Sequence, residues 1–478
     1  MKTKILFYNW IPFDETDGRG GGVTIYTRNL IRYLTEHTDW DIYFLSSGRA
    51  YDRKRKETFI ERTTNIFRGR CKSFQVVNSP VLSSAKLSFA YPGDMLEDRV
   101  LKTVVGDFLA KQGGFDIVHF QNFEGLSLSV MELKEDYPET RFIYSLHNYY
   151  LFCPQVMLWK DDSENCAEKD CGGHCISCMP ERVHKRKVIY NQQINYERTE
   201  NREISEMRKR VQAFMEKGYR IYDRCLKGRM LPGEKERLAK YFQLYRKRNV
   251  QYINQYMDLV LAVSERVSEI AIEQGVNAEK VKVDYIGTEA ADGQKQCGGY
   301  PYDGKVFYIC YLGYMRKMKG FYFLLDALER MPEKLAKNIG IKLAVKITDD
   351  AVQKRIEKLE GKFAEVIQYQ GYSHDQLPEI LRNVQLGIVP PLWEDNLPQV
   401  AIEMRSQGIP VLSSNLGGAK ELTCSQDFVF RAGDTDEFIE KINFFVRNPE
   451  QLEEYWRDAT KLTDMKAHVE ALKTLYMP

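Results

Sequence analysis

Residues 384–421 constrain the fold of this chain more than any other stretch. The apolar run 384–389 is short enough for a buried strand, and residues 410–413 are typical of a second one. Between them, Asn396 can cap a helix that Gly408 would end. Strand, loop, helix and strand in this order predict a parallel α/β unit with a right-handed crossover.

Two polar loops, 393–396 and 414–418, follow these predicted strands. In open parallel sheets, ligands bind outside the carboxyl ends of the strands. Gly417 and Gly418 precede a helix start, where backbone amides can hold an anion. Glu403 lies among apolar residues, and a buried carboxylate is costly unless it has a partner, for example a sugar or ribose hydroxyl. By spacing alone, an ion-paired helix residue beside an ordinary turn explains the pattern equally well.

The spacing of the two acids resembles the signature of the glycosyltransferase family 4 enzymes. Asp395 is followed after seven residues by Glu403, then by Gly-x-Pro-Val and by Ser-Asn-x-Gly-Gly-x-x-Glu. The family more often has Glu at the first position, and Arg405 is unusual after the second acid. The resemblance implies that the paired acids hold the ribose and the sugar of a nucleotide-sugar donor. It adds further donor-binding residues: Asn396, Asn415, Gly417, Gly418 and Glu421.

The N-terminal residues predict a strand (4–10), a glycine-rich loop (11–22) and an amphipathic helix (23–35). Such a loop lets backbone amides approach a phosphate or a sugar. The signal is weak alone, because the glycines form neither a proper Gly-x-Gly-x-x-Gly nor a P-loop, and a flexible turn explains them as well. The family resemblance implies that Gly21 and Gly22 lie near the donor diphosphate and the acceptor.

Further strands alternate with helical or irregular segments and predict a parallel sheet. We expect these strands at 41–47, 115–121, 141–147, 259–264 and 282–286. Residues 50–100 are rich in Ser, Arg and aromatic residues and predict a loop excursion over the cleft. His147 closes one strand. A lone His is more often structural, but the resemblance implies that His147 contacts the donor or the acceptor, with Asn148 where the family often has Asp.

A second domain is predicted to open with a strand at 306–312, after a linker at 294–304. The loop Gly-Tyr-Met-Arg-Lys-Met-Lys-Gly that follows resembles the family's phosphate clamp, with Lys319 in register and Tyr314 at the usual Arg position. Arg316 is the nearest candidate for the second cation. Two cations here would neutralise a departing diphosphate; the alternative is a basic turn before a helix.

Half of the ten cysteines fall within 153–178. Their spacing is typical of a closed structural zinc site, and the alternative is a coincidence of free thiols. The four expected ligands are Cys166, Cys171, Cys175 and Cys178. Cys153 or His174 could substitute for one of them. Four thiolates leave no open position, so no catalytic metal is predicted.

Residues 181–250 are helical in pattern and basic, with 20 Lys and Arg against 9 Asp and Glu. Such a charge run is either a solvated face or a surface that is attracted to an anionic bilayer, at roughly 1 kcal/mol per basic residue near the membrane. A lipid-linked acceptor would require docking of this kind.

Composition excludes several classes of protein. The formal charge of the 478 residues is +2, which gives no reason to expect a nucleic-acid partner, and no apolar run approaches the ~20 residues of a membrane span. The first residues are better explained by a strand than by a signal peptide. We therefore expect a cytoplasmic protein, with a peripheral position on the inner face of the membrane as the alternative.

The resemblance implies an α/β protein of two facing Rossmann-like domains, the GT-B architecture. The expected units are an N-terminal acceptor domain (1–290), a donor domain (305–455) and a helix that crosses back (456–478). The implied function is a retaining hexosyltransferase that moves sugar from a nucleotide diphosphate donor to an oligosaccharide or polyprenyl-linked acceptor in surface polysaccharide or glycoconjugate synthesis. The alternatives are a non-catalytic nucleotide-sugar-binding protein and a nucleotide-sugar epimerase or a phosphorylase of the same architecture.

Overall fold

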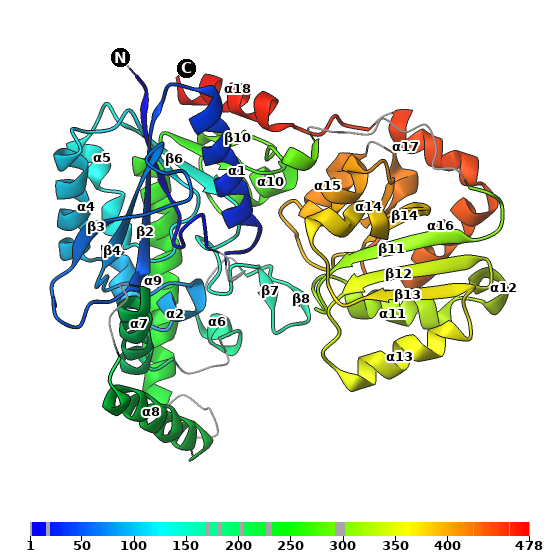
Figure 1. Cartoon of the computed structure of the whole chain (residues 1–478), viewed down its shortest axis with the longest axis horizontal. Coiled ribbons are helices and arrows are strands. Elements are labelled where there is room, and N and C mark those ends of the chain that lie inside the picture. Colours follow the sequence, from blue (N-terminus) through cyan, green and yellow to red (C-terminus); the bar gives the residue numbers. More distant parts are fainter. Residues whose placement is uncertain are drawn as a thin grey trace.

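The computed structural model describes residues 2–15, 20–168, 172–179, 183–199, 204–225, 232–291, 302–423, 425–457 and 459–477. Within these ranges, two large, mainly parallel sheets form the centres of two halves of the molecule, which lie side by side in Figure 1. This arrangement confirms the predicted α/β class with two facing parallel sheets. The predicted linker, 294–304, falls mostly outside the described residues.

The N-terminal half has an eight-stranded sheet in the order β10-β9-β6-β5-β1-β2-β4-β3. Its strands are β1 (Lys4–Tyr8), β2 (Asp41–Ala50), β3 (Phe59–Thr63), β4 (Cys71–Val77), β5 (Ile117–Phe120), β6 (Arg141–Leu146), β9 (Leu259–Ala262) and β10 (Val281–Val283). The central strand β1 pairs in parallel with β2 and β5, so that Ile5 lies beside Ile42 and Ile117. All three isoleucines are buried, as expected for a parallel sheet that is covered on both faces.

The predicted loop excursion over residues 50–100 is wrong, because two strands lie in its first part and two short helices, Ala85–Ser88 and Pro92–Leu96, lie in its second part. Strands β3 and β4 occupy this region and form an antiparallel pair at the edge of the sheet. An edge pair is only partly covered, so polar and apolar residues mix along it, as in Phe-Ile-Glu-Arg-Thr of β3. This mixture concealed the strands in the sequence, because fully buried parallel strands are more uniformly apolar.

Some helices of the N-terminal half connect these strands. Others, which lie in the sequence between residues 173 and 256, form a separate helical layer. The connecting helices are α1 (Gly21–His37), α2 (Ala85–Ser88), α3 (Pro92–Leu96), α4 (Arg99–Lys111), α5 (Leu133–Asp136) and α10 (Glu265–Glu273). The helical layer contains α6 (Gly173–Ser177), α7 (Lys185–Thr199), α8 (Glu206–Cys225) and α9 (Pro232–Tyr256). A small hairpin, β7 (Trp159–Lys160) and β8 (Glu164–Asn165), precedes this layer and points toward the other half (Figure 1).

The C-terminal half has a six-stranded parallel sheet in the order β13-β12-β11-β14-β15-β16. Its strands are β11 (Phe307–Gly313), β12 (Ile339–Val345), β13 (Glu365–Tyr369), β14 (Val384–Val389), β15 (Val411–Ser414) and β16 (Val429–Phe430). Its helices are α11 (Phe321–Arg330), α12 (Glu333–Ala336), α13 (Asp350–Glu360), α14 (Leu377–Ile380), α15 (Gln399–Ser406), α16 (Thr435–Arg447) and α17 (Glu454–Arg457). The unit predicted from residues 384–421 is thus β14-α15-β15.

The last helix, α18 (Met465–Tyr476), returns to the N-terminal half and packs against α1. Tyr26 Oη lies 2.7 Å from Nε2 of His468, and Tyr476 Oη lies 2.6 Å from Nδ1 of His119. Arg405, the residue that is unusual for the motif, helps to hold the connection to this helix. Its buried guanidinium donates a hydrogen bond to the Thr460 carbonyl. The C-terminal residues therefore tie the two halves together.

Among the described residues, no helix combines the length and the apolar character that crossing a bilayer requires.

Candidate active site

A cleft of about 600 Å³ lies between the two halves, at the carboxyl ends of the strands. The N-terminal half contributes the first turns of α1, the loop before it and the residues that follow β6. The C-terminal half contributes the loops after β11, β12, β13 and β14 together with α15. Seven predicted site residues line it: Gly21, Gly22, His147, Lys319, Asp395, Asn396 and Glu403. Residues from distant parts of the sequence are therefore brought together as the parallel topology requires.

Lys319 is held against Asp395 by an ion pair of 2.6 Å. Its Nζ also lies 5.1 Å from the centre of the Trp393 ring. The backbone of the loop is fixed by Gly320, which has φ of 75° and whose Cβ, if it had one, would lie 1.7 Å from the Pro390 carbonyl oxygen. Because no other residue fits there, the glycine sets the path of the chain and thus the position of the neighbouring lysine.

Glu403 is buried on α15, where two side chains meet its carboxylate. Tyr372 donates a hydrogen bond of 2.9 Å to Oε2, and Nε2 of His374 lies 3.0 Å from Oε1. The hydrogen bond to Glu403, with a smaller contribution from its charge, raises the pKa of His374. Burial, with the nearby Glu403 carboxylate, raises the pKa of Tyr372. The carboxylate is therefore fixed in orientation at the cleft wall.

Buried polar atoms without a hydrogen-bond partner among the described residues also line the cleft. They include Nε1 of Trp393, Nδ2 of Asn396 and Oγ1 of Thr24. Such groups are costly to bury unless something satisfies them. Two of the three are N–H donors, so the cleft fits a ligand that supplies oxygen acceptors.

The prediction that Asn396 caps a helix is wrong. Helix α15 begins at Gln399 with Pro398 at its N-cap position and no side-chain cap. The Asn396 carbonyl instead accepts a hydrogen bond of 2.7 Å from Ser264 of the other half. Pro398 itself is extended, with ψ of 118°, and the residue before a proline disfavours the helical conformation, so the helix begins only after the proline.

The glycine pair after β15 does not line the cleft and is satisfied within the protein. Gly417 N donates to Glu394 Oε2 at 2.8 Å, and Gly418 N donates to the Asp395 carbonyl at 2.9 Å. Gly417 has φ of 67°, and a Cβ there would lie 2.1 Å from the Asp395 carbonyl oxygen. The predicted anion contact thus exists in this structure, but the anion is the protein's own Glu394.

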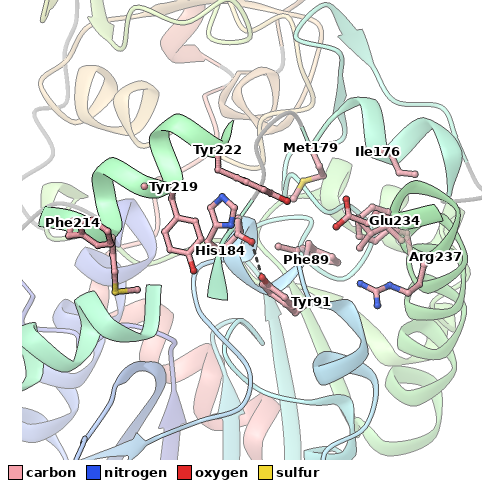
Figure 2. A pocket seen from close by; sticks show the side chains of 16 residues that line it. Phe89, Tyr91, Ile176, Met179, His184, Phe214, Tyr219, Tyr222, Glu234 and Arg237 are labelled. Atoms are coloured by element: carbon pink, nitrogen blue, oxygen red, sulfur yellow. Dashed lines mark hydrogen bonds between the residues drawn. The ribbon is translucent and has the colours of Figure 1, made fainter. Parts of the chain in front are cut away.

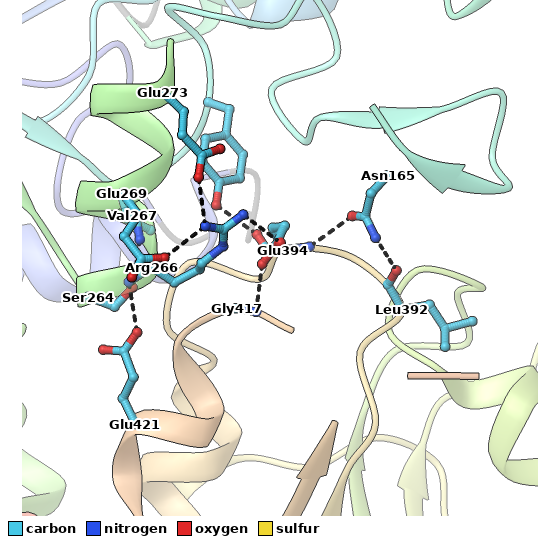
Figure 3. Close-up of polar contacts among 11 residues, drawn as sticks. Asn165, Ser264, Arg266, Val267, Glu269, Glu273, Leu392, Glu394, Gly417 and Glu421 are labelled. Carbon is cyan, nitrogen blue, oxygen red and sulfur yellow. Dashed lines mark hydrogen bonds and ion pairs between the residues drawn. The ribbon is translucent and has the colours of Figure 1, made fainter. Parts of the chain in front are cut away.

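Three further predicted residues lie outside the cleft lining. Glu421 accepts hydrogen bonds from the amides of Glu265 and Arg266, at 2.9 and 2.8 Å, and from Tyr285. Asn415 is turned away and accepts from Ala432 N. Arg316 is exposed and lines a neighbouring cavity. Glu421 therefore joins the two halves, as Figure 3 shows, by capping the start of α10.

A second link between the halves surrounds Glu394 (Figure 3). Its carboxylate pairs with Arg266 at 3.1 Å, and Arg266 also pairs with Glu269 and Glu273. On the other side, Asn165 of the β7–β8 hairpin donates to the Leu392 carbonyl and accepts from Glu394 N. These polar contacts define how the two cleft walls face each other.

His147 is held by Gln121, whose Oε1 accepts a hydrogen bond of 2.7 Å from Nε2. Burial, together with the nearby His468, lowers the pKa of His147 to about 3. The ring is therefore neutral near pH 7 and can exchange hydrogen bonds with a ligand hydroxyl, but it is not a charged acid there.

Sequence reasoning missed two groups near the cleft. Lys346, at the end of β12, lines the cleft, whereas the predicted Arg316 does not. Glu124 is buried in the neighbouring cavity of about 750 Å³, which Gly21 and Asn148 also line. Burial raises the pKa of Glu124 to about 7. Neither residue belongs to a recognisable motif. Glu124 could have been indicated by its position after the predicted strand 115–121, but the strand before Lys346, β12, was not predicted.

The four predicted zinc ligands are only partly described. Cys171 lies outside the described residues, and among the described residues no group of three His, Cys, Asp or Glu could hold a metal ion. Burial raises the pKa of Cys153 to about 11, with a small contribution from Cys166. Burial also raises the pKa of Cys178, with smaller contributions from Asp161 and Cys175. The zinc site therefore stays a prediction.

Comparison with known proteins agrees with this geometry. Residues 299–462 match the family described as glycosyl transferases group 1. Three similar solved structures cover 98–100% of both chains. These are Anabaena Alr3699/HepE in complex with UDP and glucose (16% identity, TM-score 0.53), sucrose-phosphate synthase from Thermosynechococcus elongatus (14%, 0.55) and the lipopolysaccharide outer core galactosyltransferase WaaB (14%, 0.55).

The chain has the GT-B fold. The family match ends before α18 and leaves the N-terminal half of this GT-B protein unmatched. No curated protein matches the sequence. At identities of 14–16%, the solved structures establish the architecture of the chain and leave its activity to be argued from the cleft.

Proposed function

We propose that the protein is a retaining glycosyltransferase of family 4 that uses a nucleotide diphosphate sugar as donor. The observation that carries the proposal is the C-terminal wall of the cleft. It presents a cation (Lys319), a fixed carboxylate (Glu403) and the unpartnered N–H donors of Trp393 and Asn396 within one cavity. These groups match the phosphates and hydroxyls of a sugar nucleotide.

Lys319 has the position and charge to act on the diphosphate. In the absence of donor its ammonium is paired with Asp395. A bound diphosphate would share this cation, and the interaction would strengthen as negative charge accumulates on the departing group. Lys346 lines the cleft from the C-terminal half, where Arg316 does not, and we assign to it the role of the second cation on the diphosphate.

Glu403 and Asp395 would accept hydrogen bonds from hydroxyl groups of the ribose and the donor sugar. Because Tyr372 and His374 already orient the Glu403 carboxylate, its binding geometry is fixed before the donor arrives. The neutral His147 faces them from the N-terminal wall, where an acceptor hydroxyl would enter. The solved complexes of Alr3699/HepE contain UDP or UDP-glucose, which makes UDP-glucose the first donor to test.

The acceptor is proposed to be an oligosaccharide or a lipid-linked saccharide, and the protein is proposed to contact an anionic membrane surface with α7, α8 and α9. These helices carry 16 Lys and Arg against 6 Asp and Glu. Sedimentation with anionic vesicles at low salt, lost at high salt, is expected because the Debye length falls to ~3 Å at 1 M. Equal sedimentation with neutral vesicles would contradict an electrostatic contact.

A panel of nucleotide sugars, tested by thermal shift and by release of the nucleoside diphosphate, checks the main proposal. We expect one donor to raise the melting temperature and to release its diphosphate, with faster release when acceptor is added. Binding without release would favour a nucleotide-sugar-binding protein, and a changed sugar without release would favour an epimerase. No stabilisation by any nucleotide sugar would contradict all three.

A further inference from the structure

A second cavity, of about 640 Å³, lies within the helical layer of the N-terminal half (Figure 2). It is separate in its lining residues from the cleft between the halves. Its volume falls in the range of small-molecule sites, roughly 300–1,000 Å³. Most of its lining is aromatic or aliphatic: Phe89, Tyr91, Ile176, Met179, Phe214, Met215, Tyr219, Tyr222, Leu238 and Phe242.

Specific contacts keep the wall of this cavity in place. Tyr91 donates a hydrogen bond of 2.8 Å to the Val183 carbonyl and accepts one of 2.9 Å from Lys185 N. His184 stacks on Tyr219, with ring centres 4.2 Å apart. The cavity is therefore bounded by groups that are tied to one another, and Figure 2 shows their side chains around a common space.

The cavity opens onto an apolar stripe of α8. The stripe consists of five side chains that are 40–78% exposed: Met207, Val211, Phe214, Ile221 and Tyr222. Along the helix, successive members are four, three, seven and one residues apart. This spacing places them on one face. Because Phe214 and Tyr222 both belong to the stripe and line the cavity, an apolar surface continues from solvent into the cavity.

The helix beside this apolar surface is basic. The helix α8 carries six Lys and Arg against three Asp and Glu, and Arg237 of α9 lines the cavity itself, together with Glu234. An apolar face with basic residues beside it is typical of helices that lie in a membrane interface. The ligand that complements both features has an apolar chain and an anionic head.

We infer that this cavity binds the apolar chain of a phosphate-bearing lipid, with the phosphate near Arg237. The inference rests on the proposed lipid-linked acceptor and adds a site for its tail, distant from the sugar-binding cleft. The α8 stripe would contact the acyl region of the bilayer, so that the chain passes from the membrane into the cavity without entering water.

Gly218 offers a way to fill the cavity without disturbing the helix. It lies on α8 and lines the cavity, and no atom comes within 4 Å of a Cβ built on it. A leucine there would occupy ligand space, and it would favour the helix because glycine is a poor helix former. Ala213→Leu is the matched control, since Ala213 is exposed on the same helix and does not line the cavity.

Calorimetric titration of the full chain with farnesyl phosphate tests the inference. We expect saturable binding to the parent and to Ala213→Leu, and at least tenfold weaker binding to Gly218→Leu. Farnesol should bind the parent more weakly than farnesyl phosphate, and Arg237→Ala should remove that difference. Inorganic phosphate alone should not compete.

Several outcomes would overturn the inference. These are the absence of binding to the parent, equal binding to Gly218→Leu, or equal affinity for farnesol and farnesyl phosphate. Concentration-dependent dimerisation that Phe214→Ser abolishes, without lipid binding, would assign the stripe to a contact between copies. Nucleoside diphosphate release from the donor is measured in parallel. Release of the nucleoside diphosphate without binding of farnesyl phosphate would contradict the lipid site alone. Binding of farnesyl phosphate without release of the nucleoside diphosphate would contradict the proposed transferase activity.

Discussion

The two walls of the cleft differ in charge. The C-terminal wall presents ionised groups that are paired, such as Lys319 with Asp395 and Glu403 with His374. Beside Glu15 and Arg28, the N-terminal wall presents His147, whose pKa burial lowers to about 3 so that the ring is neutral near pH 7. The adjoining cavity holds Glu124, whose pKa burial raises to about 7. One wall suits a charged donor, and the other suits an uncharged acceptor.

This difference has a physical reason. A departing diphosphate gains negative charge and needs fixed positive charges beside it. Burying such charges costs less free energy when each is paired before the ligand binds. An acceptor hydroxyl gains nothing from a permanent charge nearby but can use neutral hydrogen-bonding groups. Removing charge should therefore affect the two walls differently, and four changes test this contrast.

The largest effect is expected for Lys319→Ala. The account predicts a fall in kcat of about 100- to 1,000-fold, with a smaller change in donor affinity, because the charge matters most in the transition state. Steady-state kinetics with the accepted donor measure this. Lys317→Ala is the control, since Lys317 is exposed on the same loop and pairs with Asp162 at 3.6 Å, outside the cleft. Equal kcat in both variants would remove the distinction between the walls.

The second largest effect is expected for Glu403→Gln. The amide keeps the size of the side chain and an acceptor for Tyr372 but loses the charge-assisted hydrogen bonds to donor hydroxyls. Donor affinity should fall about 10- to 100-fold, since a hydrogen bond to a charged group contributes roughly 1.5–3 kcal/mol. Calorimetry provides the dissociation constants, and circular dichroism checks the fold. An unchanged constant would exclude Glu403 from donor binding.

For the N-terminal wall, Glu124→Gln should alter the dependence of stability on pH. A carboxyl with a folded pKa of about 7, raised from 4.5, binds its proton more tightly in the folded state. The parent therefore loses stability as pH rises from 4.5 to 7, at about 1.4 kcal/mol per unit. Urea unfolding at several pH values should show the variant gaining up to about 3 kcal/mol relative to the parent. Parallel pH profiles would show that Glu124 is ionised in the folded protein.

The smallest effect is expected for the link between the walls. Arg266→Ala removes the partner of Glu394 and loosens one contact that orients the halves. The pair is partly exposed, so the expected loss in kcat/KM is only about two- to fivefold. Arg355→Ala, which breaks a surface pair on α13, is the control. A loss in kcat/KM as large as that of Lys319→Ala would mean that the orientation of the two halves, and not the charge on the C-terminal wall, limits the reaction.

The sequence predicted some strands of each sheet and missed others, among them β3 and β4 of the N-terminal half and β12 of the C-terminal half, for reasons that particular residues make clear. The strand 384–389 was found because it is short, wholly apolar and bounded by turn residues, and β14 has those bounds. The edge strand β3 and its neighbour β4 were missed because partial exposure mixes polar residues into them.

Site residues that belong to a local sequence motif could be predicted, and those that only the fold brings to the cleft could not. Lys319, Asp395 and Glu403 stand at fixed spacings, and all three line the cleft. Lys346 and His374 reach it from other loops, a juxtaposition that only the folded sheet creates. Gly417 and Glu421 have the expected sequence context, but their partners, Glu394 and the start of α10, could not be deduced from it.

Photolabelling with an azido analogue of the nucleotide sugar that stabilises the protein most tests the central claim directly. Mass spectrometry of the labelled peptides locates the base and sugar. The account predicts labelling within 311–319, 371–374 or 389–403, abolished by excess unmodified donor and strongly reduced in Glu403→Gln. Competed labelling confined to the helices between 185 and 256, or to the N-terminal wall alone, would contradict the assignment of the C-terminal wall as the donor site.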